Sequence, residues 1–473
     1  MKVLFVHSEE DNYSVEKPLD GYERMQFGIS YISSLLKSRG HETRLVVPTR
    51  LDDSAVEEHI KDLKPELICF TSVYTEFEFL SGIAGKVKRA HPDIFLLVGG
   101  PHASLKPEEC LARAFDAACV GEGEYPTLEL VEQLLSGSSP HGIANLQIKT
   151  GGGVERNEPR PFIEDLDALP FPDREIWIPW LANPLSRPSV LAARGCPFQC
   201  TYCCNHALSH LADGGYVRMR SPRNVYEEIK EIKTRLPLLE EVYLEAETLG
   251  VNQEWAIELC SMLEQLNSEF EVPIAFGSNL RVTPRTEYEE LFTAFKKSNF
   301  RFINIGLESG SERIRRDVLK RNYSNEDIVR AVTAAKKHGL EVGIYNLIGL
   351  PGETRKDFRD TVRINRICKP DWFLLSVFFP YPGTRLYDVC VEQGLMEMPP
   401  DSKLERRRPV LDLPDFSKRA VGRRHTWSPL LIYWGYRPLV ELLWLVTMAK
   451  IYSHPKVLRL YRGFNSRFRP YEF

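Results

Sequence analysis

The chain has 473 residues, more than one ordinary hydrophobic core can hold, and this length predicts two or three domains. Its composition, with 43% hydrophobic and 27% charged residues, is typical of a soluble globular protein, and a formal net charge of −4 gives no reason to expect a nucleic-acid partner. That average conceals a basic tail, because residues 403–473 contain 15 Lys and Arg against 5 Asp and Glu.

The N-terminal segment MKVLFVHSEE has an apolar run too short for the hydrophobic region of a signal peptide, so it predicts a first β-strand. Without an export signal we expect a cytoplasmic protein in a reducing compartment, where the ten cysteines do not form a disulfide framework. Seven of them share no spacing, and we expect small buried apolar side chains. These seven are Cys69, Cys110, Cys119, Cys204, Cys260, Cys368 and Cys390.

Short β-rich runs alternate with helical patterns over the first ~135 residues, which is typical of a parallel sheet covered by helices. The predicted strands are 2–7, 43–47, 67–72, 95–99 and 117–120. The predicted helices lie near 28–38, 54–61, 76–90 and 127–135. This rhythm predicts a doubly wound α/β domain whose ligand would lie in the crevice beyond the carboxyl ends of the strands.

Residues 136–172 differ in character, since they carry GSSP, TGGG and several prolines, and they predict a linker with a small hairpin. The alternation of strands and helices returns between residues 188 and 394. Six strands with helices between them favour a barrel or partial barrel over a second open sheet. The predicted strands are 189–193, 241–244, 274–278, 302–306, 341–348 and 372–378.

Three cysteines in RGCPFQCTYCC, namely Cys196, Cys200 and Cys203, follow the spacing C-x3-C-x2-C directly after the strand SVLAA. Three thiolates on one short loop can ligate three irons of a [4Fe-4S] cubane and leave the fourth iron open. Structural zinc sites normally use four ligands in paired C-x2-C arrangements, and no fourth partner with that spacing is evident. The pattern therefore favours an iron–sulfur cluster over zinc or three unligated cysteines.

The motif from Cys196 to Cys203, with the aromatic Tyr202 before the last cysteine, resembles the signature of radical S-adenosylmethionine (SAM) enzymes. In that family SAM chelates the fourth iron, and the reduced cluster cleaves SAM to a 5′-deoxyadenosyl radical that abstracts hydrogen from a substrate. The resemblance implies that the three cysteines are the catalytic cluster ligands and that Cys204 is a neighbour, not a ligand. It also implies an electron donor such as flavodoxin or ferredoxin.

Downstream segments look like the strand ends of the same family, and the resemblance covers roughly residues 187–394. Their order behind the cysteine loop is the specific signal, because barrel active sites collect the carboxyl ends of several strands. These segments are EVYLEAETLGVN, SNLRV, IGLESGSERIRRDVLKR and YNLIGLPGET. A strand-end carboxylate can bind a ribose hydroxyl or the SAM amino group, and glycines let the backbone approach the adenine. The expected SAM-binding residues are Tyr202, Glu245, Asn279, Arg281, Glu308, Gly349, Pro351 and Gly352.

The front domain resembles the cobalamin-binding domain that precedes the catalytic core in one radical SAM subfamily. The matching segments are MKVLFVH, FGISYISSLLKSRGHE, LICFTSVY, VGGPHAS and VGEGE. Small residues at strand ends leave a slot for a flat macrocycle or its nucleotide tail. The expected cobalamin-binding residues are Thr71, Ser72, Gly99, Gly100, Gly121 and Glu122.

One departure from related domains concerns the cobalt ligand. Methionine-synthase-like domains supply a lower-axial histidine from a D-x-H-x-x-G motif, which is absent here because SEEDNYS follows His7. We expect His102 to be a turn residue and any bound cobalamin to be base-off, without a histidine ligand. The alternative interpretation is a domain that has lost its cofactor or holds another nucleotide.

The resemblances divide the chain into a cobalamin-binding Rossmann-like domain (1–138), a linker (139–183), a partial (β/α)6 radical SAM barrel (184–396) and a basic, aromatic-rich helical extension (397–473). The extension contains RRR at 406–408 and the stretch WSPLLIYWGYRPLVELLWLVTMAKIY, whose charged residues and proline argue against a transmembrane helix. It suits an amphipathic helix on a membrane surface or a lid over an apolar substrate, and equally a helical extension packed on the barrel. The acidic remainder of the chain argues against RNA.

The resemblance implies C-methylation of an unactivated carbon in a small, lipid-like or natural-product substrate, with a [4Fe-4S] cluster, SAM and cobalamin as cofactors. Radical ring formation or oxidoreduction without methyl transfer is the alternative. A methylthiotransferase is disfavoured, because Cys69, Cys110 and Cys119 do not form the extra cluster set of that family. A non-catalytic cluster or corrinoid sensor is the alternative from another class.

Overall fold

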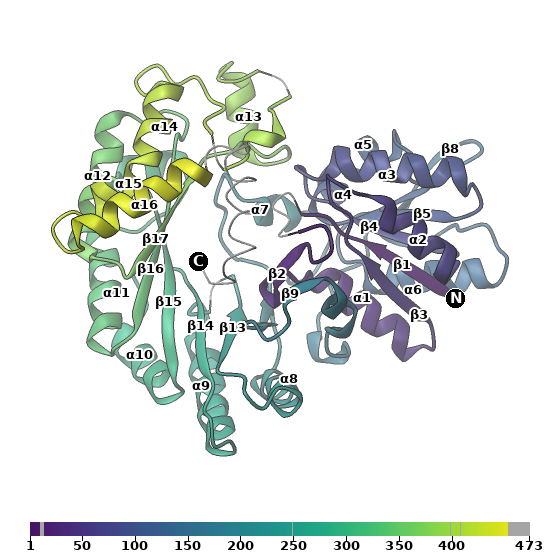
Figure 1. The fold of residues 1–473 in the computed structure, drawn as a ribbon, viewed down its shortest axis with the longest axis horizontal. Helices are drawn as coiled ribbons and strands as arrows, with labels where there is room; N and C mark the ends of the chain where they lie inside the picture. The colour runs from purple at the N-terminus through teal and green to yellow at the C-terminus, as the bar shows by residue number, and fades with distance from the viewer. Residues whose placement is uncertain (10–13, 248, 398, 407, 453–473) are drawn as a thin grey trace. The chain divides into compact units, whose positions relative to one another are not determined.

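The computed structural model describes residues 1–9, 14–247, 249–397, 399–406 and 408–452 (Figure 1). The chain forms two compact units. The first, called here the N-terminal unit, comprises Met1–Phe198, Cys203–Ala246 and Phe270–Ile274. The second, called the C-terminal unit, comprises Gln199–Tyr202, Glu247–Glu269 and the chain from Ala275 onward.

A seven-stranded sheet with the order β3-β1-β4-β5-β6-β7-β8 organises the N-terminal unit. The strands β3, β1, β4, β5 and β6 are parallel, as the alternation of elements predicts. The central strand β1 is a continuous apolar run because both of its faces are covered, and Val3, Leu4 and Phe5 are at most 1% exposed. The bounds are β1 (Lys2–Val6), β3 (Glu42–Val46), β4 (Leu67–Thr71), β5 (Phe95–Gly99), β6 (Ala117–Cys119), β7 (Leu146–Thr150) and β8 (Gly153–Arg156).

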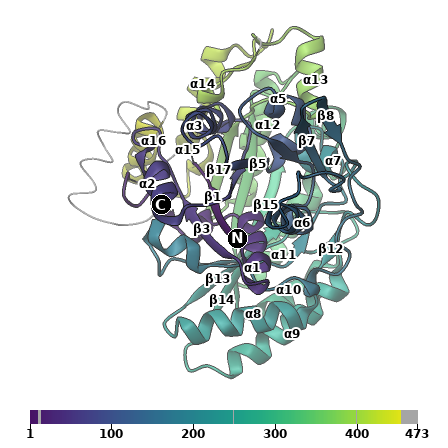
Figure 2. The ribbon, with the colours of Figure 1, turned by 90° about the vertical axis from the view of Figure 1, so that its right-hand side faces the viewer.

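Helices cover both faces of this sheet. Figures 1 and 2 show α1 and α6 side by side on one face, with α2 and α3 on the other, so the predicted doubly wound arrangement is confirmed. The helices are α1 (Phe27–Ser38), α2 (Ser54–Leu63), α3 (Phe77–Ala90), α4 (Pro101–Leu105), α5 (Pro107–Leu111) and α6 (Glu124–Leu135).

The segment after α6 packs on this sheet. The expected hairpin forms from β7 and β8, and it extends the sheet because β7 pairs antiparallel with β6. Further along, the Trp177 indole donates to Ser30 Oγ at 2.8 Å, and the Trp180 indole donates to the Leu45 carbonyl at 3.0 Å. Strand β9 (Leu181–Asn183) then pairs in parallel with β2 (Leu19–Gly21).

All six strands predicted for the second α/β region form. In the N-terminal unit, β10 (Ser189–Leu191) pairs in parallel with β13 (Glu241–Glu245), and β11 (Ala193–Arg194) pairs antiparallel with β12 (Arg218–Met219). This unit also contains α7 (Cys204–Leu208) and α8 (Pro222–Arg235).

In the C-terminal unit, four strands run parallel in the order β14, β15, β16 and β17. Helices alternate with them, and capping boxes begin α11 at Ser324 and α12 at Thr354. The strands are β14 (Ala275–Leu280), β15 (Phe300–Glu308), β16 (Glu341–Ile348) and β17 (Trp372–Val377). The helices are α9 (Gln253–Ser268), α10 (Tyr288–Lys297), α11 (Asn325–Lys337), α12 (Arg355–Cys368) and α13 (Arg385–Glu392). The predicted α/β fold class is therefore confirmed.

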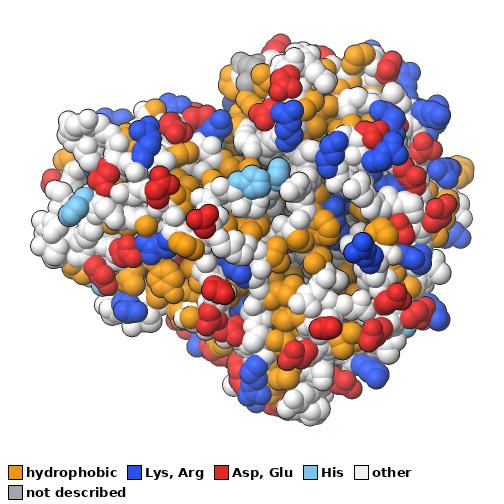
Figure 3. Space-filling view, turned by 180° about the vertical axis from the view of Figure 1, so that it is seen from behind, with side chains coloured by type: hydrophobic (Ala, Val, Ile, Leu, Met, Phe, Trp, Pro, Cys, Tyr) orange, Lys and Arg blue, Asp and Glu red, His pale blue; other side chains and the backbone are white. Residues whose placement is uncertain are grey.

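The described part of the C-terminal extension is helical, as expected, with α14 (Lys418–Thr426), α15 (Ser428–Tyr433) and α16 (Leu439–Tyr452). Arg407 and residues 453–473 lie outside the described residues. α16 is not the amphipathic helix that was one of the expectations, because apolar side chains occur on every side of it. No described helix is long and apolar enough to span a bilayer. In Figure 3, Lys and Arg side chains gather toward the upper right of the C-terminal unit.

Candidate active site

The predicted cluster loop begins directly after β11, and its entry is sterically fixed. Gly195 has φ = +82°, and a Cβ at this position would collide with the backbone of Tyr216, so glycine is required there. Beyond it, Cys196 and Cys203 are half-buried and Cys200 is buried, and all three are free thiols.

The described residues include no group of three or more His, Cys, Asp or Glu side chains placed to hold a single metal ion. A cubane cluster makes a different demand, because its three thiolates bind three separate irons and need not converge on one point. The donor set, three cysteines on one short loop with an accessible side, fits such a cluster.

The middle of the loop, Gln199–Tyr202, belongs to the C-terminal unit and is held by other residues of that unit. Arg281, which follows β14, places Nη1 3.0 Å from Cys200 Sγ. Thr201 donates through its hydroxyl to the Val318 carbonyl at 2.6 Å, and its carbonyl accepts from the Leu386 amide at 2.8 Å. A guanidinium beside the sulfur favours the thiolate form that iron requires.

Glu308, the last residue of β15, has a strained backbone. Its φ is +60°, the left-handed region that a non-glycine residue seldom occupies. Arg321 pairs with the Glu308 carboxylate at 3.1 Å and donates to the Gly306 carbonyl at 2.9 Å. The Arg321 guanidinium also lies 5.9 Å from the centroid of the Tyr202 ring, so one buried arginine connects the strand end to the cysteine loop.

The ends of the neighbouring strands carry the other expected SAM residues of this unit. Asn279 lies in β14, and its Oδ1 is buried without a hydrogen-bond partner among the described residues, which leaves an acceptor for a ligand. After β16, Glu353 Oε2 accepts from the amides of Gly349 and Leu350 at 2.6 and 3.1 Å. This closes the turn that contains Pro351 and Gly352. Burial raises the pKa of Glu353 to about 8.

Glu245 is the expected SAM residue that belongs to the N-terminal unit. It ends β13, and its carboxylate accepts from Ser189 Oγ at 3.5 Å. Glu247, two residues further along the chain, belongs to the C-terminal unit.

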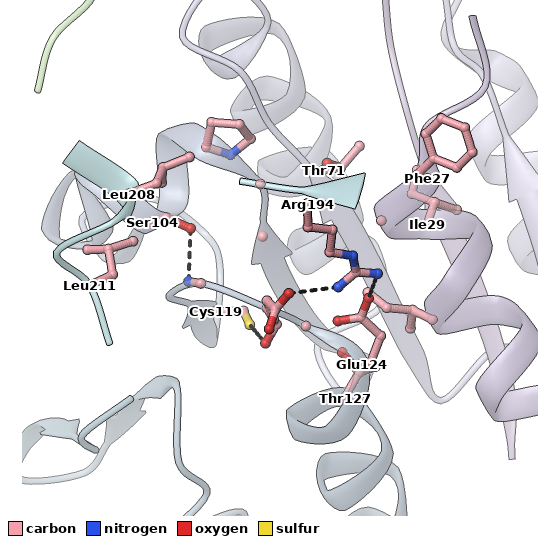
Figure 4. A pocket seen from close by; sticks show the side chains of 18 of the residues that line it. Phe27, Ile29, Thr71, Ser104, Cys119, Glu124, Thr127, Arg194, Leu208 and Leu211 are labelled. Carbon is pink, nitrogen blue, oxygen red and sulfur yellow. Dashed lines mark hydrogen bonds and ion pairs between the residues drawn. The ribbon is translucent and has the colours of Figure 1, made fainter. Parts of the chain in front are cut away.

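A cavity of about 320 Å³ lies within the N-terminal unit, beyond the carboxyl ends of its parallel strands (Figure 4). Its wall is mostly apolar. Cys69 and Cys119 contribute neutral thiols, because burial raises the pKa of both. Leu208 and Leu211 come from the segment after the cysteine loop. The cavity wall thus combines the front domain with residues that flank the cluster loop.

Five of the six residues expected to bind cobalamin line this cavity: Thr71, Gly99, Gly100, Gly121 and Glu122. The sixth, Ser72, holds the turn behind it, since its amide donates to the Gly99 carbonyl at 2.9 Å. Gly100 has φ = +92°, and a Cβ there would lie 2.8 Å from the Ser72 carbonyl oxygen. The Gly121 amide donates to Ser104 Oγ at 3.0 Å, as Figure 4 shows.

An ionic network joins the glycine-rich acidic loop of the front domain to β11 and β12. Arg194 donates to Glu122 at 2.8 Å and to Glu124 at 2.6 Å (Figure 4), and Arg218 donates to Glu122 at 2.9 Å. Burial alone would raise the pKa of Glu122, but Arg194 and Arg218 hold it below its ordinary value. Burial would lower the pKa of Arg194, but Glu124 and Glu122 raise it. The network therefore stays charged.

No histidine lines the cavity among the described residues. His102 was expected in a turn, but it lies in the helix α4. The centroid of its ring lies 4.3 Å from the centroid of the Phe77 ring. Burial lowers the pKa of His102 to about 4, so its imidazole is neutral. His7 packs edge-on against Trp177 at a centroid distance of 5.6 Å.

Family models account for both regions of the chain. Residues 190–364 match the radical SAM superfamily, and residues 21–131 match the B12-binding domain. The chain therefore combines a radical SAM domain with a B12-binding domain. These two domains imply a [4Fe-4S] cluster, SAM and cobalamin as the cofactors of this enzyme.

Several curated proteins are similar over most of this radical SAM enzyme. An uncharacterized methyltransferase of Pyrococcus horikoshii is 27% identical, covering 89% of this chain and 90% of its own. An anaerobic magnesium-protoporphyrin IX monomethyl ester cyclase of Rubrivivax gelatinosus is 26% identical, covering 82% and 69%. The hopanoid C-3 methylase of Methylococcus capsulatus is 25% identical, covering 81% and 71%.

Solved structures share the fold. The cobalamin-dependent SAM radical enzyme OxsB, in its apo form, matches with a TM-score of 0.71 at 15% identity, covering 98% of this chain and 74% of its own. The radical SAM methyltransferase TsrM of Kitasatospora setae matches with a TM-score of 0.67 at 19% identity, covering 84% and 78%.

Sequence reasoning about this radical SAM enzyme missed the charged residues that join its segments. Arg194 carries a weak signal, since it is a charged residue between an apolar strand and the cysteine motif, and Glu124 lies in the VGEGE loop. Arg218 and Arg321 carry no local signal, because their partners Glu122 and Glu308 are identified only by tertiary structure.

Proposed function

We propose that this enzyme transfers a methyl group to an unactivated carbon of a lipid-like or natural-product substrate. The observation that carries the proposal is the composition of one cavity wall. Thr71 and Gly100 of the B12-binding domain line the same cavity as Gly195, the residue immediately before Cys196. A cofactor seated at the strand ends of the front domain would therefore lie beside the start of the cluster loop.

Cys196, Cys200 and Cys203 would hold the cluster in this proposal. SAM bound to such a cluster supplies a 5′-deoxyadenosyl radical when the cluster is reduced, and cobalamin supplies a methyl group. Arg281 would offset the negative charge of the thiolate at Cys200, since its guanidinium lies 3.0 Å from that sulfur.

The chain's own polar groups would orient SAM. The buried, unpartnered Asn279 Oδ1 can accept a hydrogen bond from a ligand N–H or O–H, and the Glu308 carboxylate can accept from the amino group or a ribose hydroxyl. Arg321 holds that carboxylate in place. The turn from Gly349 to Gly352, fixed by Glu353, presents backbone where the adenine is expected. Tyr202 and Glu245 remain proposed SAM contacts.

We infer that cobalamin is bound base-off and without a histidine ligand. The apolar cavity suits the nucleotide tail, and the described lining residues offer no imidazole to cobalt. Electron paramagnetic resonance of the reduced Co(II) holoenzyme tests this inference. We expect no hyperfine splitting from an axial nitrogen, and a nitrogen-split spectrum would contradict it.

Anaerobic reconstitution with iron, sulfide and hydroxocobalamin, followed by mass spectrometry with methyl-labelled SAM and an extracted isoprenoid lipid fraction, tests methyl transfer. A labelled lipid product would support the proposal. Conversion of the lipid without label would instead support radical ring formation or oxidoreduction, the second candidate, which the similarity to the Rubrivivax gelatinosus cyclase favours.

A non-catalytic sensor would bind the cofactors but leave SAM intact. Formation of 5′-deoxyadenosine by the reduced, reconstituted enzyme therefore separates an enzyme from a sensor. We propose a flavodoxin or ferredoxin as the electron donor, and reduced flavodoxin should replace a chemical reductant in this assay. Cleavage that proceeds only with the chemical reductant would count against such a donor.

A further inference from the structure

The last described helices carry a cluster of exposed apolar side chains, called here the apolar edge. Val440 is 81% exposed, Trp434 56%, Leu439 53%, Leu443 50% and Trp444 49%. These residues come from α16 and the turn before it. Single exposed apolar residues are ordinary, but several large ones within eleven positions mark an interaction site.

The apolar edge belongs to a packed structure. On its inner side, α16 buries Leu442 against Ile432 and Tyr433 of α15, and Val362 of α12 packs against the same small core. The Lys450 ammonium lies 5.0 Å from the centroid of the Trp427 ring. Because the inner side of α16 is already anchored, its outer apolar side chains remain available for another surface.

A basic groove of about 510 Å³ lies next to this helix pair, between α12, α14 and α15. Arg359, Arg363 and Arg366 line it from one face of α12, since they are spaced by four and three residues, and Arg424 of α14 completes the set. Apolar side chains form the rest of the wall: Phe358, Val362, Ile367 and Leu431.

Most of this positive charge is not neutralised within the groove. Arg363 lies 3.5 Å from Asp360 on an exposed part of the helix, and Arg366 donates to the Leu431 carbonyl at 2.7 Å. The side chains of Arg359 and Arg424 have neither an ion pair nor a hydrogen bond to another described residue. The groove can therefore attract anions. α15 contacts both α12 of the groove and α16 of the apolar edge, so the two features are neighbours.

We propose that the apolar edge and the basic groove together dock the C-terminal unit on an anionic lipid bilayer. Interfacial binding requires apolar and aromatic side chains that enter the acyl boundary and basic side chains that meet anionic headgroups. Trp434 and Trp444 would lie at the headgroup level, Leu439, Val440 and Leu443 would enter below it, and the four arginines would face phosphate groups. A helix that binds an anionic membrane needs positive charges beside its apolar side chains. α16 has few of its own, and the arginines of α12 and α14 supply them.

Charge complementarity favours an anionic membrane over a second copy of this chain. Two copies meeting face to face would bring two sets of arginines together, because a twofold interface uses the same patch on both partners. The net positive charge of residues 403–473, with 15 basic and 5 acidic residues, acts in the same direction. This proposal does not depend on the chemistry of the active site.

Vesicle co-sedimentation of the full-length holoenzyme tests the proposal. We expect binding to vesicles of phosphatidylcholine with one part in four phosphatidylglycerol, weaker binding to pure phosphatidylcholine, and a decrease with added salt. Leu443→Glu should weaken the apparent affinity roughly tenfold. Arg359→Glu should weaken it roughly fivefold or more. Equal binding to both vesicle types would overturn the proposal.

Matched substitutions outside the apolar edge and the basic groove control for the general effect of adding a negative charge to the protein. Leu238→Glu changes an 84% exposed leucine of the N-terminal unit, and Arg89→Glu reverses an exposed arginine of α3. Both should bind vesicles like the unsubstituted protein, and all four variants should still cleave SAM, which shows that they fold. Loss of binding in the controls equal to that in Leu443→Glu would contradict the assignment of this surface.

Bromine-labelled lipids provide a second readout. Quenching of tryptophan fluorescence on anionic vesicles should fall in the Trp444→Phe variant if that side chain enters the bilayer. Two other outcomes would overturn the proposal. One is concentration-dependent self-association in sedimentation velocity that Leu443→Glu abolishes, without vesicle binding. The other is binding of an RNA oligonucleotide that Arg359→Glu abolishes, with vesicles unbound.

Discussion

Arg194 donates to the Glu122 carboxylate at 2.8 Å and stands two residues before the first cysteine of the cluster motif. Glu122 comes from the B12-binding domain, so this pair joins the two cofactor regions within the N-terminal unit. Both side chains are about 15% exposed and therefore weakly screened by solvent. The pair makes the position of the cluster loop depend on an acidic loop 72 positions earlier in the chain.

Glu122→Gln should destabilise the N-terminal unit, because it leaves Arg194 and Arg218 with less counter-charge in a buried network. Removing one partner of a buried ion pair costs roughly 3 kcal/mol, measured as the free energy of unfolding in urea. Glu129→Gln is the matched control, since its partner Arg160 also belongs to this unit but Glu129 is 43% exposed. The control should cost less than about 1 kcal/mol. Equal losses in both variants would show that the network has no special role.

Gly100→Ala should weaken cobalamin binding and stability together. The backbone at φ = +92° disfavours any side chain, and the new Cβ would press on the Ser72 carbonyl. The strain costs roughly 1–3 kcal/mol. Gly82→Ala in α3, where nothing lies within 4 Å of the new Cβ, should instead be neutral or stabilising. Cobalamin affinity, measured by the change in its absorption spectrum, should fall only for Gly100→Ala.

Glu308→Gln should weaken SAM binding by roughly tenfold, because a charge-assisted hydrogen bond becomes a neutral one and the ion pair with Arg321 is lost. Arg321→Lys should weaken it as well, since Lys cannot reproduce the contacts of the guanidinium. Arg316→Lys, in an exposed ion pair with Asp317, is the matched control. Isothermal titration with SAM measures all three. Unchanged affinity in Glu308→Gln would exclude this carboxylate as a ligand.

The buried carboxyl of Glu353 should make the stability of the turn around it depend on pH. Burial raises the pKa of Glu353 to about 8, above its ordinary value of 4.5, so the folded state prefers the protonated carboxyl. The contribution of the protonated Glu353 carboxyl to the free energy of unfolding is complete below pH 4.5 and is lost as pH rises through about 8. Over that range the free energy of unfolding falls by at most ~1.4 kcal/mol per pH unit.

Hydrogen exchange of the Gly349 and Leu350 amides, corrected for intrinsic rates, measures this effect. Protection should decline between pH 5 and 8 in the unsubstituted protein. In Glu353→Gln it should stay constant, because the amide oxygen still accepts both hydrogen bonds and cannot ionise. A decline of equal size in the variant would show that another group titrates.

Much of the fold could be predicted from local sequence. Strand β1 is apolar because it is covered on both faces, and the cysteine spacing indicates its chemistry without tertiary information. The left-handed conformation of Glu308 could not be predicted, since nothing in its local sequence demands it and Arg321 stabilises it from another turn. Likewise, Glu122 and Arg194 are separated by 72 positions, and only folding brings them together.

The extension shows a different limit of sequence reasoning. The apolar character of residues 439–452 is evident from the sequence, and it is compatible with an amphipathic helix, a lid or a packed helical extension. The packing of Leu442 into the small core with Ile432 divides the helix into an inner and an outer side, both of them apolar. Three of the four basic residues of the groove lie on α12, more than 70 positions earlier, where no sequence window could relate them to α16.

The iron content and SAM cleavage of anaerobically reconstituted cysteine variants test the central claim most directly. The unsubstituted enzyme and Cys204→Ser should each bind about four irons per chain and form 5′-deoxyadenosine. Cys196→Ser, Cys200→Ser and Cys203→Ser should each lose the cluster and the cleavage reaction. Retention of the cluster and of SAM cleavage in these three variants, or their loss in Cys204→Ser alone, would contradict the account.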